Sequence, residues 1–443
     1  MSKKVALHNL GCKVNAYEVE AMQQLLEKAG YEIVPFEEGA DIYLINTCTV
    51  TNIADRKSRQ MLHKAKKMNP NAIVVATGCY VQTDTQKLEE DSAVDLILGN
   101  NQKKQIVEAL EEYEKEHTKK VKVIEINKTK EYEELSIGYT AEHVRAYIKV
   151  QDGCNQFCTY CIIPYARGRV RSRKIAEVLD EVRALAARGY KEVVLTGIHL
   201  SSYGVDFKEE ERESLLSLIQ AVHEVEGIQR IRLGSLEPRI ITEEFMEGIS
   251  SLPKVCPHFH LSLQSGCDKT LRNMNRRYSA AEYAEKCELI RKFYPAPALT
   301  TDVIVGFPME TEEDFEESYE FVKNIHFYET HIFKYSRRQG TKAAAMEGQL
   351  TEAVKSIRSE KMIALHEIRA KEYETSMIGK TLELLLEEEV EINGKTYFMA
   401  HSKEYVRAVI EKTKDHKVND LVRAKAVDFA DEHVLLAICE ELY

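Results

Sequence analysis

The 443-residue chain lacks a long apolar run and lacks an excess of positive charge. No segment approaches the roughly 20 consecutive apolar residues of a transmembrane helix, which argues against a membrane-spanning protein. The 72 acidic residues outnumber the 61 basic ones, for a formal net charge of −11. Such a chain is no polycationic nucleic-acid coat, and any contact with RNA must come from a local basic patch.

The chain also lacks the apolar stretch of a secretory signal peptide at its start. Only a few apolar residues follow Lys4 before Gly11 and Lys13 interrupt them. We therefore expect no signal peptide and a cytoplasmic location. In that reducing compartment the ten cysteines are expected to stay free of disulfides. Spaced cysteines then indicate metal or redox chemistry.

The composition is that of a globular protein. Hydrophobic residues make up 44% of the chain and charged residues 30%, which is too apolar for a disordered protein. At roughly 100–200 residues per domain, the length predicts two to four domains, each with its own core.

Residues 1–112 alternate short apolar runs with amphipathic stretches. The runs are rich in β-branched residues and end in turn residues, which predicts buried parallel strands at Val5–Gly11, Ile42–Cys48, Ala72–Tyr80 and Val94–Asn100. Between them, Ala16–Gly30 and Ile53–Met68 have helical spacing. This alternation predicts a doubly wound α/β domain. Residues 113–140 are expected to form a solvated connector or an edge hairpin, because 14 of the 24 residues from 111 to 134 are charged.

A second βα series covers residues 141–374. Six strand candidates lie at Val144–Val150, Glu192–Ile198, Arg230–Ser235, Phe259–Leu263, Leu299–Gly306 and His331–Tyr335. Helical stretches separate them, at Ile175–Arg188, Leu215–Val225, Ala280–Lys292 and Glu312–Lys323. Six βα units predict a (β/α)6 part-barrel, with its active site at the carboxyl ends of the strands.

The last segment, residues 375–443, differs in character and follows a long charged helix at about Thr351–Glu374. Its short strand-like runs predict a small all-β barrel: Leu382–Leu386, Thr396–Ala400, Val406–Ile410, Leu421–Val427 and Val434–Ile438. From residue 377 onward, 9 basic and 14 acidic residues give a charge of −5, so this barrel is not an obvious RNA platform.

Three cysteines follow the first strand of the second series within eight residues. Cys154, Cys158 and Cys161 form a Cys-x-x-x-Cys-x-x-Cys motif. Three thiolates from one loop can hold three corners of a [4Fe–4S] cluster and leave the fourth iron open to a ligand. A zinc site is the alternative, although structural zinc takes four ligands and no further Cys or His follows at a suitable spacing.

Three other cysteines each lie at the predicted carboxyl end of a strand in the first domain. Cys12, Cys48 and Cys79 are separated by about thirty residues each. Ligands of open α/β sheets collect outside those ends, so the three thiols can meet in a second three-thiolate site. The alternative is that they are buried small apolar side chains, but Gly11 and Gly78 before two of them allow a bulky group to approach the backbone. Four more cysteines are interpreted as structural: Cys256, Cys267, Cys287 and Cys439.

The motif at Cys154, Cys158 and Cys161, with Tyr160 before its last cysteine, resembles the radical S-adenosylmethionine (SAM) superfamily. The resemblance implies a SAM-binding cluster whose open iron holds the methionyl group and whose electron cleaves SAM to a 5′-deoxyadenosyl radical. By the same resemblance Tyr160, Gly197, Ser235 and Gln264 are expected to contact SAM. Each could instead belong to an ordinary strand-to-helix turn.

The motifs of the whole chain, taken in order, resemble the methylthiotransferases of that superfamily. The resemblance implies a second [4Fe–4S] cluster on Cys12, Cys48 and Cys79, a C-terminal TRAM-like barrel, and replacement of a C–H by C–SCH₃. One SAM would then supply the radical and another the methyl group. The words Gly-Cys-Lys-Val-Asn and Asn-Thr-Cys-Thr-Val-Thr-Asn are most similar to the MtaB-type branch, which acts on N6-threonylcarbamoyladenosine next to the tRNA anticodon.

One basic segment favours an RNA substrate. Residues 165–174 hold five basic and no acidic residues just beyond the cysteine motif, with Arg167, Arg169, Arg171 and Arg173 in alternation. We interpret them as an exposed loop that contacts phosphates. A solvated basic loop is the alternative. A second basic group, Arg272, Arg276 and Arg277, follows a later strand.

The expected partners are a tRNA anticodon stem-loop and an electron donor such as flavodoxin or ferredoxin, with no DNA and no membrane. Three alternatives stay open. They are methylthiolation of an aspartate in a ribosomal protein, methylthiolation of N6-isopentenyladenosine in tRNA, and an iron–sulfur or zinc protein that only binds RNA.

Overall fold

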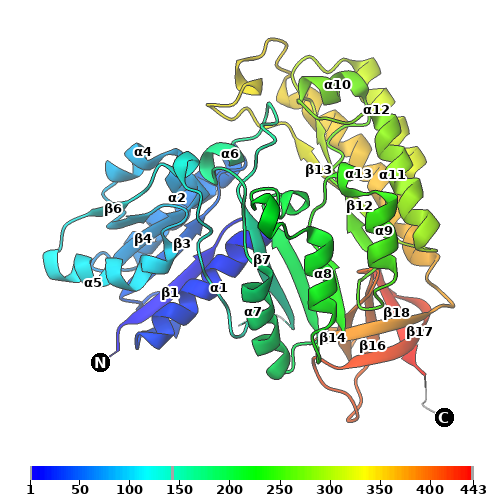
Figure 1. Ribbon diagram of the computed structural model, residues 1–443, viewed down its shortest axis with the longest axis horizontal. Coiled ribbons are helices and arrows are strands. Elements are labelled where there is room, and N and C mark those ends of the chain that lie inside the picture. Colours follow the sequence, from blue (N-terminus) through cyan, green and yellow to red (C-terminus); the bar gives the residue numbers. More distant parts are fainter. Residues whose placement is uncertain (1, 141–143, 441–443) are drawn as a thin grey trace.

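The computed structural model describes residues 2–140 and 144–440. In chain order it has an N-terminal α/β body, a central open barrel and a C-terminal closed barrel, so the predicted fold class is confirmed (Figure 1). No helix among these residues is long and apolar enough to cross a membrane.

The N-terminal sheet has six parallel strands in the order β2-β1-β3-β4-β5-β6. Their bounds are β1 (Lys4–Asn9), β2 (Glu32–Val34), β3 (Ile42–Thr47), β4 (Ile73–Gly78), β5 (Leu96–Leu98) and β6 (Lys120–Lys122). The helices are α1 (Lys13–Lys28), α2 (Asn52–Met68), α3 (Cys79–Thr83), α4 (Thr85–Glu89) and α5 (Ile106–Glu116). One face packs on α1 and α5 and the other on α2 to α4, which makes the sheet doubly wound.

The prediction of an edge hairpin in the connector, residues 113–140, is wrong. Strand β6 pairs parallel to β5, with Lys120 opposite Leu96, so it is an edge strand of the N-terminal sheet. The later connector is not fully solvated either. Leu135 and Ile137 are buried with Tyr17 of α1 and Val178 of the central domain, because they fill the junction between the two bodies.

The central domain has six parallel strands in an open arc. They are β7 (Arg145–Asp152), β9 (Glu192–Gly197), β10 (Arg230–Leu233), β11 (His258–His260), β12 (Ala298–Val305) and β13 (Glu329–Lys334). Single bridges, such as Leu236 with Leu261, join the β7-β9-β10 half to the β11-β12-β13 half. The two-residue β8 (Arg171–Ser172) lies antiparallel to β7. This arrangement confirms the predicted part-barrel.

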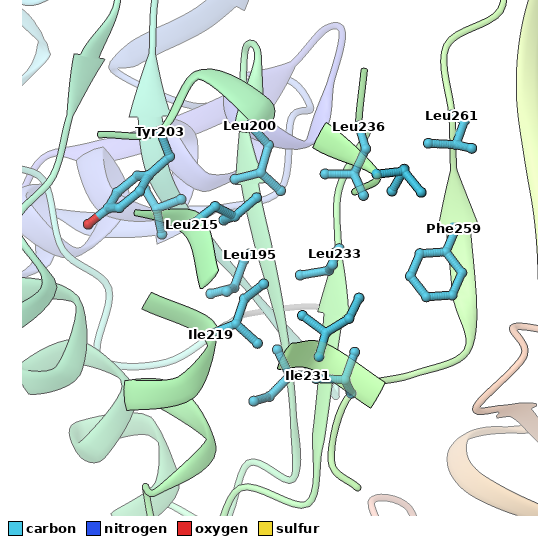
Figure 2. Close-up of a cluster of buried hydrophobic side chains, with 14 of the residues drawn as sticks. Leu195, Leu200, Tyr203, Leu215, Ile219, Ile231, Leu233, Leu236, Phe259 and Leu261 are labelled. Atoms are coloured by element: carbon cyan, nitrogen blue, oxygen red, sulfur yellow. The ribbon is translucent and has the colours of Figure 1, made fainter. Parts of the chain in front are cut away.

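Helices cover the outside of this arc. They are α7 (Ile175–Ala187), α8 (Leu215–His223), α9 (Glu243–Ser250), α10 (Asp268–Asn273), α11 (Ala280–Phe293), α12 (Glu312–Ile325) and α13 (Glu352–Thr375), whereas the short α6 (Ile163–Ala166) contacts α3 of the N-terminal body. Figure 2 shows how Leu195, Leu233 and Phe259 of adjacent strands pack with Leu215 and Ile219 of α8. Burial of each such side chain contributes about 1.5–3 kcal/mol, so this layer holds the strand ends in fixed positions.

The C-terminal barrel is closed, in the order β14-β15-β16-β18-β17. Its strands are β14 (Thr381–Ile392), β15 (Lys395–Ser402), β16 (Arg407–Glu411), β17 (Leu421–Asp431) and β18 (Val434–Cys439). It contacts the amino-terminal end of the part-barrel, where Arg230 pairs with Glu383 at 2.9 Å and Arg232 donates to the Lys403 carbonyl at 2.9 Å. The C-terminal barrel therefore closes the floor of the part-barrel and leaves the carboxyl ends of its strands free.

Candidate functional site

The first cysteine triad lies in the loop that follows β7, at the carboxyl end of the strand. The loop turns so that the Cys161 N–H donates to the Cys158 carbonyl at 3.0 Å. Two donors point at sulfur: the Gln156 N–H at 3.5 Å from Cys154 Sγ, and the Arg276 guanidinium at 3.3 Å from Cys158 Sγ. Such donors stabilise the thiolate, which is the form that binds iron.

Burial makes two thiols of this triad harder to deprotonate. It raises the pKa of Cys154 to about 11 and also raises the pKa of Cys161, and the charge of Cys158 adds to both shifts. A free thiol would keep its proton here at neutral pH. Three crowded thiolates need positive charge among them, so the donor set fits a cationic iron centre.

The second triad lies at the carboxyl ends of three adjacent strands. Cys12 is the N-cap of α1 after β1, Cys48 follows β3, and Cys79 is the first residue of α3 after β4. Burial, together with the smaller effects of the Cys79 and Cys12 charges, raises the pKa of Cys48 to about 12. The three thiols therefore act on one another, as the order of the strands predicts.

Two glycines allow the three segments to approach. Gly78 has φ +96°, and a Cβ there would lie 2.4 Å from Asn46 Oδ1. Gly11 has φ +112°, and a Cβ there would lie 3.1 Å from Cys48 Sγ. A side chain at either position would push the cysteine segments apart.

Neither triad is compact enough for a single zinc ion. Zn–S bonds of about 2.3 Å in a tetrahedron place the sulfurs roughly 3.8 Å apart. Within residues 2–140 and 144–440, the one trio of metal-binding side chains with all ligand atoms within 4.8 Å of one another is His260, Asp302 and His331. The wider spacing of the cysteines suits a cluster better than zinc.

A buried polar network joins the two triads. Arg167 follows the first triad, and its Nε donates to Cys79 Sγ of the second at 3.1 Å. The same guanidinium donates to Glu18 Oε2 of α1 at 3.0 Å, and Lys149 contacts the other Glu18 oxygen at 2.8 Å. Burial alone would raise the pKa of Glu18, but the charges of Arg167, Lys103 and Lys149 hold it well below its usual value.

The prediction of an exposed arginine loop is wrong for three of its four arginines. Arg167 and Arg171 have 0% exposure and Arg173 has 5%. Arg171 donates to the carbonyls of Arg167 and Arg169, and Arg173 forms an ion pair with Glu181. These side chains hold the domain junction together and are not available to phosphates.

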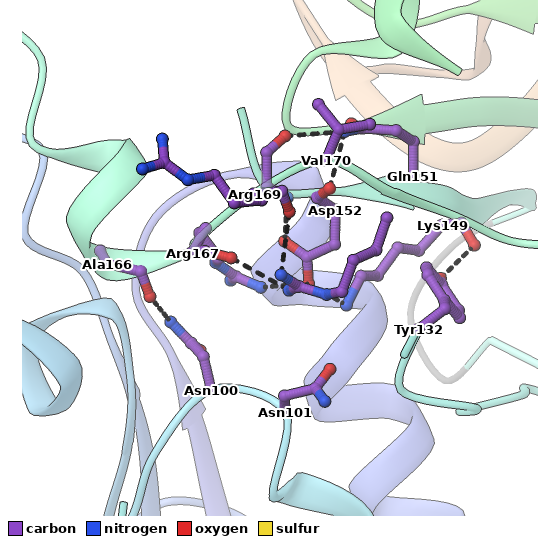
Figure 3. A network of polar contacts seen from close by, with 12 residues as sticks. Asn100, Asn101, Tyr132, Lys149, Gln151, Asp152, Ala166, Arg167, Arg169 and Val170 are labelled. Carbon is purple, nitrogen blue, oxygen red and sulfur yellow. Dashed lines mark hydrogen bonds and ion pairs between the residues drawn. The ribbon is translucent and has the colours of Figure 1, made fainter. Parts of the chain in front are cut away.

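Arg169 alone keeps the predicted exposure. Its side chain is exposed and lies 4.4 Å over the ring of Phe157, and it extends away from the buried network in Figure 3. In the second basic group, Arg272 and Arg277 are exposed, whereas Arg276 contacts the Cys158 sulfur. Any phosphate contact near the first triad therefore depends on fewer arginines than the sequence indicates.

A cavity of about 200 Å³ lies at the carboxyl ends of the strands, between the two bodies. Tyr160 and Gln264, two of the four predicted SAM contacts, line it, and so do Val50 and Thr51 from the loop after Cys48. Gln264 has φ +73°, a strained conformation for a residue other than glycine. Gly197 ends β9 and Ser235 is an exposed residue after β10, and neither of them lines this cavity.

His199 is a polar residue just after the carboxyl end of β9, and it is not among the predicted site residues. Its Nδ1 lies 2.7 Å from Ser202 Oγ, and its Nε2 is buried without a partner. Burial, together with the smaller effects of the Arg276 and Arg239 charges, lowers the pKa of His199 to about 4. Buried polar atoms usually have a hydrogen-bond partner, so His199 Nε2 has room for a polar ligand. Because His199 also feels the charge of Arg276, which contacts Cys158, SAM at the strand ends fits this position.

The inner wall of the part-barrel is polar. His260 Nε2 lies 3.2 Å from the Asp302 carboxylate, and the His260 and His331 rings stack at 5.6 Å. Thr300 fixes the other nitrogen of His260 at 3.0 Å. Asp302 also lines the cavity, so the wall continues into it from strands β11 to β13.

Arg338 locks the N-terminal body over this cavity. It forms an ion pair with Asp55 and donates to Thr49 Oγ1 at 2.7 Å. The Asn52 N–H donates to Ser336 Oγ at 3.1 Å. These contacts fix the Val50–Thr51 loop, which follows Cys48 of the second triad, beside the cavity that Tyr160 of the first motif lines.

Two family models match the chain, one in the N-terminal body and one in the part-barrel. Residues 4–99 match the Uncharacterized protein family UPF0004, and residues 148–322 match the Radical SAM superfamily. Each triad falls within or directly beside a matched region.

Curated relatives match almost the whole chain. The threonylcarbamoyladenosine tRNA methylthiotransferase MtaB of Bacillus subtilis (strain 168) is 42% identical over 95% of this chain and 93% of its own length. MtaB of Aquifex aeolicus (strain VF5) is 44% identical over 89% and 95%. The tRNA-2-methylthio-N(6)-dimethylallyladenosine synthase of Thermoanaerobacter pseudethanolicus (strain ATCC 33223 / 39E) is 37% identical over 86% and 81%.

Solved structures share the fold at low identity. The radical S-adenosylmethionine methyltransferase TsrM from Kitasatospora setae is 16% identical, with a TM-score of 0.56 over 75% of this chain and 73% of that one. The cobalamin-dependent S-adenosylmethionine radical enzyme OxsB is 11% identical, with a TM-score of 0.52 over 84% and 56%. With 42% identity over nearly its full length to a curated relative, the chain belongs to the methylthiotransferase family of radical SAM enzymes.

Proposed function

We propose that the protein converts the C2–H of N6-threonylcarbamoyladenosine, next to a tRNA anticodon, to C2–SCH₃. The observation that carries this is the pair of cysteine triads at strand ends, with Arg167, from the loop after the first triad, in contact with Cys79 of the second. The substrate comes from the printed names of the relatives at 42% and 44% identity.

Six cysteines are assigned to two [4Fe–4S] clusters. Cys154, Cys158 and Cys161 would hold the cluster that binds SAM, and Cys12, Cys48 and Cys79 the auxiliary one. With SAM, these groups supply the radical and sulfur chemistry that amino-acid side chains cannot perform on an unactivated C–H.

The chain's own residues position and shield that chemistry. Tyr160 and Gln264 line the cavity and are proposed to contact SAM, whereas the roles of Gly197 and Ser235 rest on the family resemblance alone. Arg276 holds the Cys158 sulfur, and Arg167 holds the Cys79 sulfur. Ser336 holds the Val50–Thr51 loop against the cavity through the Asn52 N–H.

The proposed partners are a tRNA anticodon stem-loop and a small electron donor such as flavodoxin or ferredoxin. We expect the target base to leave its stack and enter the cavity, because C2 cannot be reached within a stacked loop. Arg169 is the proposed phosphate contact nearest to the first triad. Since tRNA is the substrate, we propose a cytoplasmic location.

The experiment uses anaerobically reconstituted enzyme with SAM and a reductant. It receives anticodon stem-loops that carry threonylcarbamoyladenosine, isopentenyladenosine or unmodified adenosine, and nucleoside mass spectrometry identifies the product. We expect about eight irons per chain, from two four-iron clusters, and a methylthio product from the first RNA alone. A product from the isopentenyladenosine RNA alone, or one cluster only, would contradict the proposal.

A further inference from the structure

Three side chains that can bind a metal ion meet on the inner wall of the part-barrel, outside both cysteine triads. The ligand atoms of His260, Asp302 and His331 all lie within 4.8 Å of one another. No other trio of histidine, cysteine or carboxylate side chains in residues 2–140 and 144–440 meets the same limit. None of the three is a proposed cluster ligand or a proposed SAM contact, so the function proposed above leaves this group without a role.

The register of three neighbouring strands places these side chains on one face. His260 of β11 lies opposite Thr300 of β12, and Asp302 of β12 lies opposite His331 of β13. Residues two apart on a strand point to the same side of the sheet, and neighbours in sequence point to opposite sides. Phe259, next to His260, accordingly packs into the apolar layer of Figure 2. The sheet therefore holds the three polar side chains together on its inner side.

The distances within the trio suit the ligands of one metal ion. His260 Nε2 lies 3.2 Å from the Asp302 carboxylate. Metal–nitrogen and metal–oxygen bonds of about 2.0–2.2 Å place neighbouring ligand atoms roughly 3.0–3.5 Å apart. The exposed His331 ring stacks on His260 with 5.6 Å between the ring centroids. A small rotation of this exposed side chain would bring its ring nitrogen into the same range.

Thr300 sets the orientation of the His260 ring. Its hydroxyl lies 3.0 Å from His260 Nδ1, which leaves Nε2 directed at Asp302. Histidines that bind metals usually have their second ring nitrogen held by such a hydrogen bond. Thr300 is only 1% exposed, so water does not compete for this contact. The buried hydroxyl therefore supports the ring in the orientation that a metal ligand needs.

A simple ion pair between His260 and Asp302 does not account for His331. The His331 ring forms no hydrogen bond or ion pair with any other side chain in the described parts of the chain, yet it lies against His260. His63 and Asp91 show the simple case, because a single histidine pairs with a carboxylate at 2.8 Å and no third ligand joins them. In the trio, one carboxylate and two imidazoles form a donor set that suits a divalent cation.

We propose that His260, Asp302 and His331 bind one divalent d-block metal ion, of the kind of Fe²⁺ or Zn²⁺. Two histidines and one carboxylate hold such ions in proteins and leave coordination positions open for water or another oxygen ligand. Asp302 also lines the cavity between the two bodies, so the open positions would lie on the cavity side. The inference goes beyond the proposed function and does not depend on the identity of the substrate.

The test measures zinc in enzyme whose two clusters are already reconstituted. The enzyme is treated with a chelator to remove loosely bound ions and is then dialysed without oxygen against a series of Zn²⁺ concentrations. Elemental mass spectrometry gives zinc and iron per chain. At saturation, wild type should hold about one zinc more than His331→Ala, a change at an exposed residue that should not affect folding. Thr300→Val should weaken zinc binding about 10- to 100-fold, and iron should be equal in all variants.

Two controls separate the trio from other places where zinc could bind. His63→Ala removes the exposed histidine of the simple pair with Asp91 and should hold as much zinc as wild type. X-ray absorption at the zinc edge identifies the ligand atoms in wild type. We expect nitrogen and oxygen at about 2.0–2.1 Å and no sulfur at about 2.3 Å.

Two results would overturn the inference. Equal zinc in wild type and His331→Ala at every Zn²⁺ concentration would show that the trio binds no metal. Sulfur among the zinc ligands would show that the ion lies on cysteines instead. Neither result bears on the proposed function, which is tested by iron content and by the methylthio product.

Discussion

Arg167 is the residue on which the junction of the two triads depends. It comes from the loop after the first triad, contacts a sulfur of the second at 3.1 Å, and pairs with Glu18 of α1. The sequence shows five basic residues in ten and predicts a phosphate-binding loop. Glu18, the acid that pairs with the buried Arg167, lies 149 residues earlier in the chain. Such a distant pairing leaves no local pattern in the sequence.

Arg167→Met should destabilise the apoprotein by about 3 kcal/mol, because it leaves Glu18 buried with less compensating charge. Urea unfolding measures this. Arg169→Met is the matched control, since Arg169 is exposed in the same loop and should change stability by less than 0.5 kcal/mol, roughly. Equal effects of the two substitutions would contradict the network as described.

Arg169→Gln should weaken tRNA binding and reduce the salt dependence by about one phosphate contact. The measurement is the slope of log K against log salt concentration for wild type and variant. An unchanged slope and affinity would show that Arg169 is a solvated residue with no role in RNA contact.

At the scale of elements, hydrophobic periodicity predicts most of the fold. The structure has α7 at Ile175–Ala187 and α12 at Glu312–Ile325, within a few residues of the predicted helices. The short edge strands are where prediction fails. Strand β6 has only three residues, and its parallel pairing with β5 depends on a chain reversal through α5 that no local pattern encodes.

The turn between β4 and α3 gives a prediction at this scale. Gly78→Ala should displace Cys79, because its Cβ would meet Asn46 Oδ1 at 2.4 Å, and the auxiliary cluster should be lost. Iron per chain should then fall from about eight to about four.

Gly30→Ala is the control for this change. Gly30 also has a positive φ, of +90°, but nothing lies within 4 Å of its added Cβ. It therefore carries only the backbone penalty, about 1–2 kcal/mol, and should keep all its iron. Loss of iron in both variants would assign the effect to stability and not to the turn.

At the scale of the whole molecule, the N-terminal body and the part-barrel meet at one cavity, and the C-terminal barrel closes the opposite end of the part-barrel. The N-terminal body borders this cavity with Val50 and Thr51, and the part-barrel borders it with Tyr160 and Gln264. The six cysteines and the three-body architecture are predictable from spacing and periodicity. The junction of the first two bodies is not, since Asp55 and Arg338 lie 283 positions apart and only the assembled fold brings them together.

Arg338→Met should loosen the N-terminal body over the cavity, because it removes the ion pair to Asp55 and the hydrogen bond to Thr49. Hydrogen exchange should rise around Thr49–Asp55, at the start of α2, with little change in β3. Unchanged exchange at these residues would contradict the role of Arg338 as a lock.

The most direct test of the central claim is nucleoside mass spectrometry of tRNA from a strain that lacks this gene. We expect the 2-methylthio form of N6-threonylcarbamoyladenosine to disappear and its precursor to accumulate. Complementation with the intact gene should restore the product, and a Cys12/Cys48/Cys79→Ala variant should not. Unchanged levels of the methylthio nucleoside in the deletion strain would contradict the account.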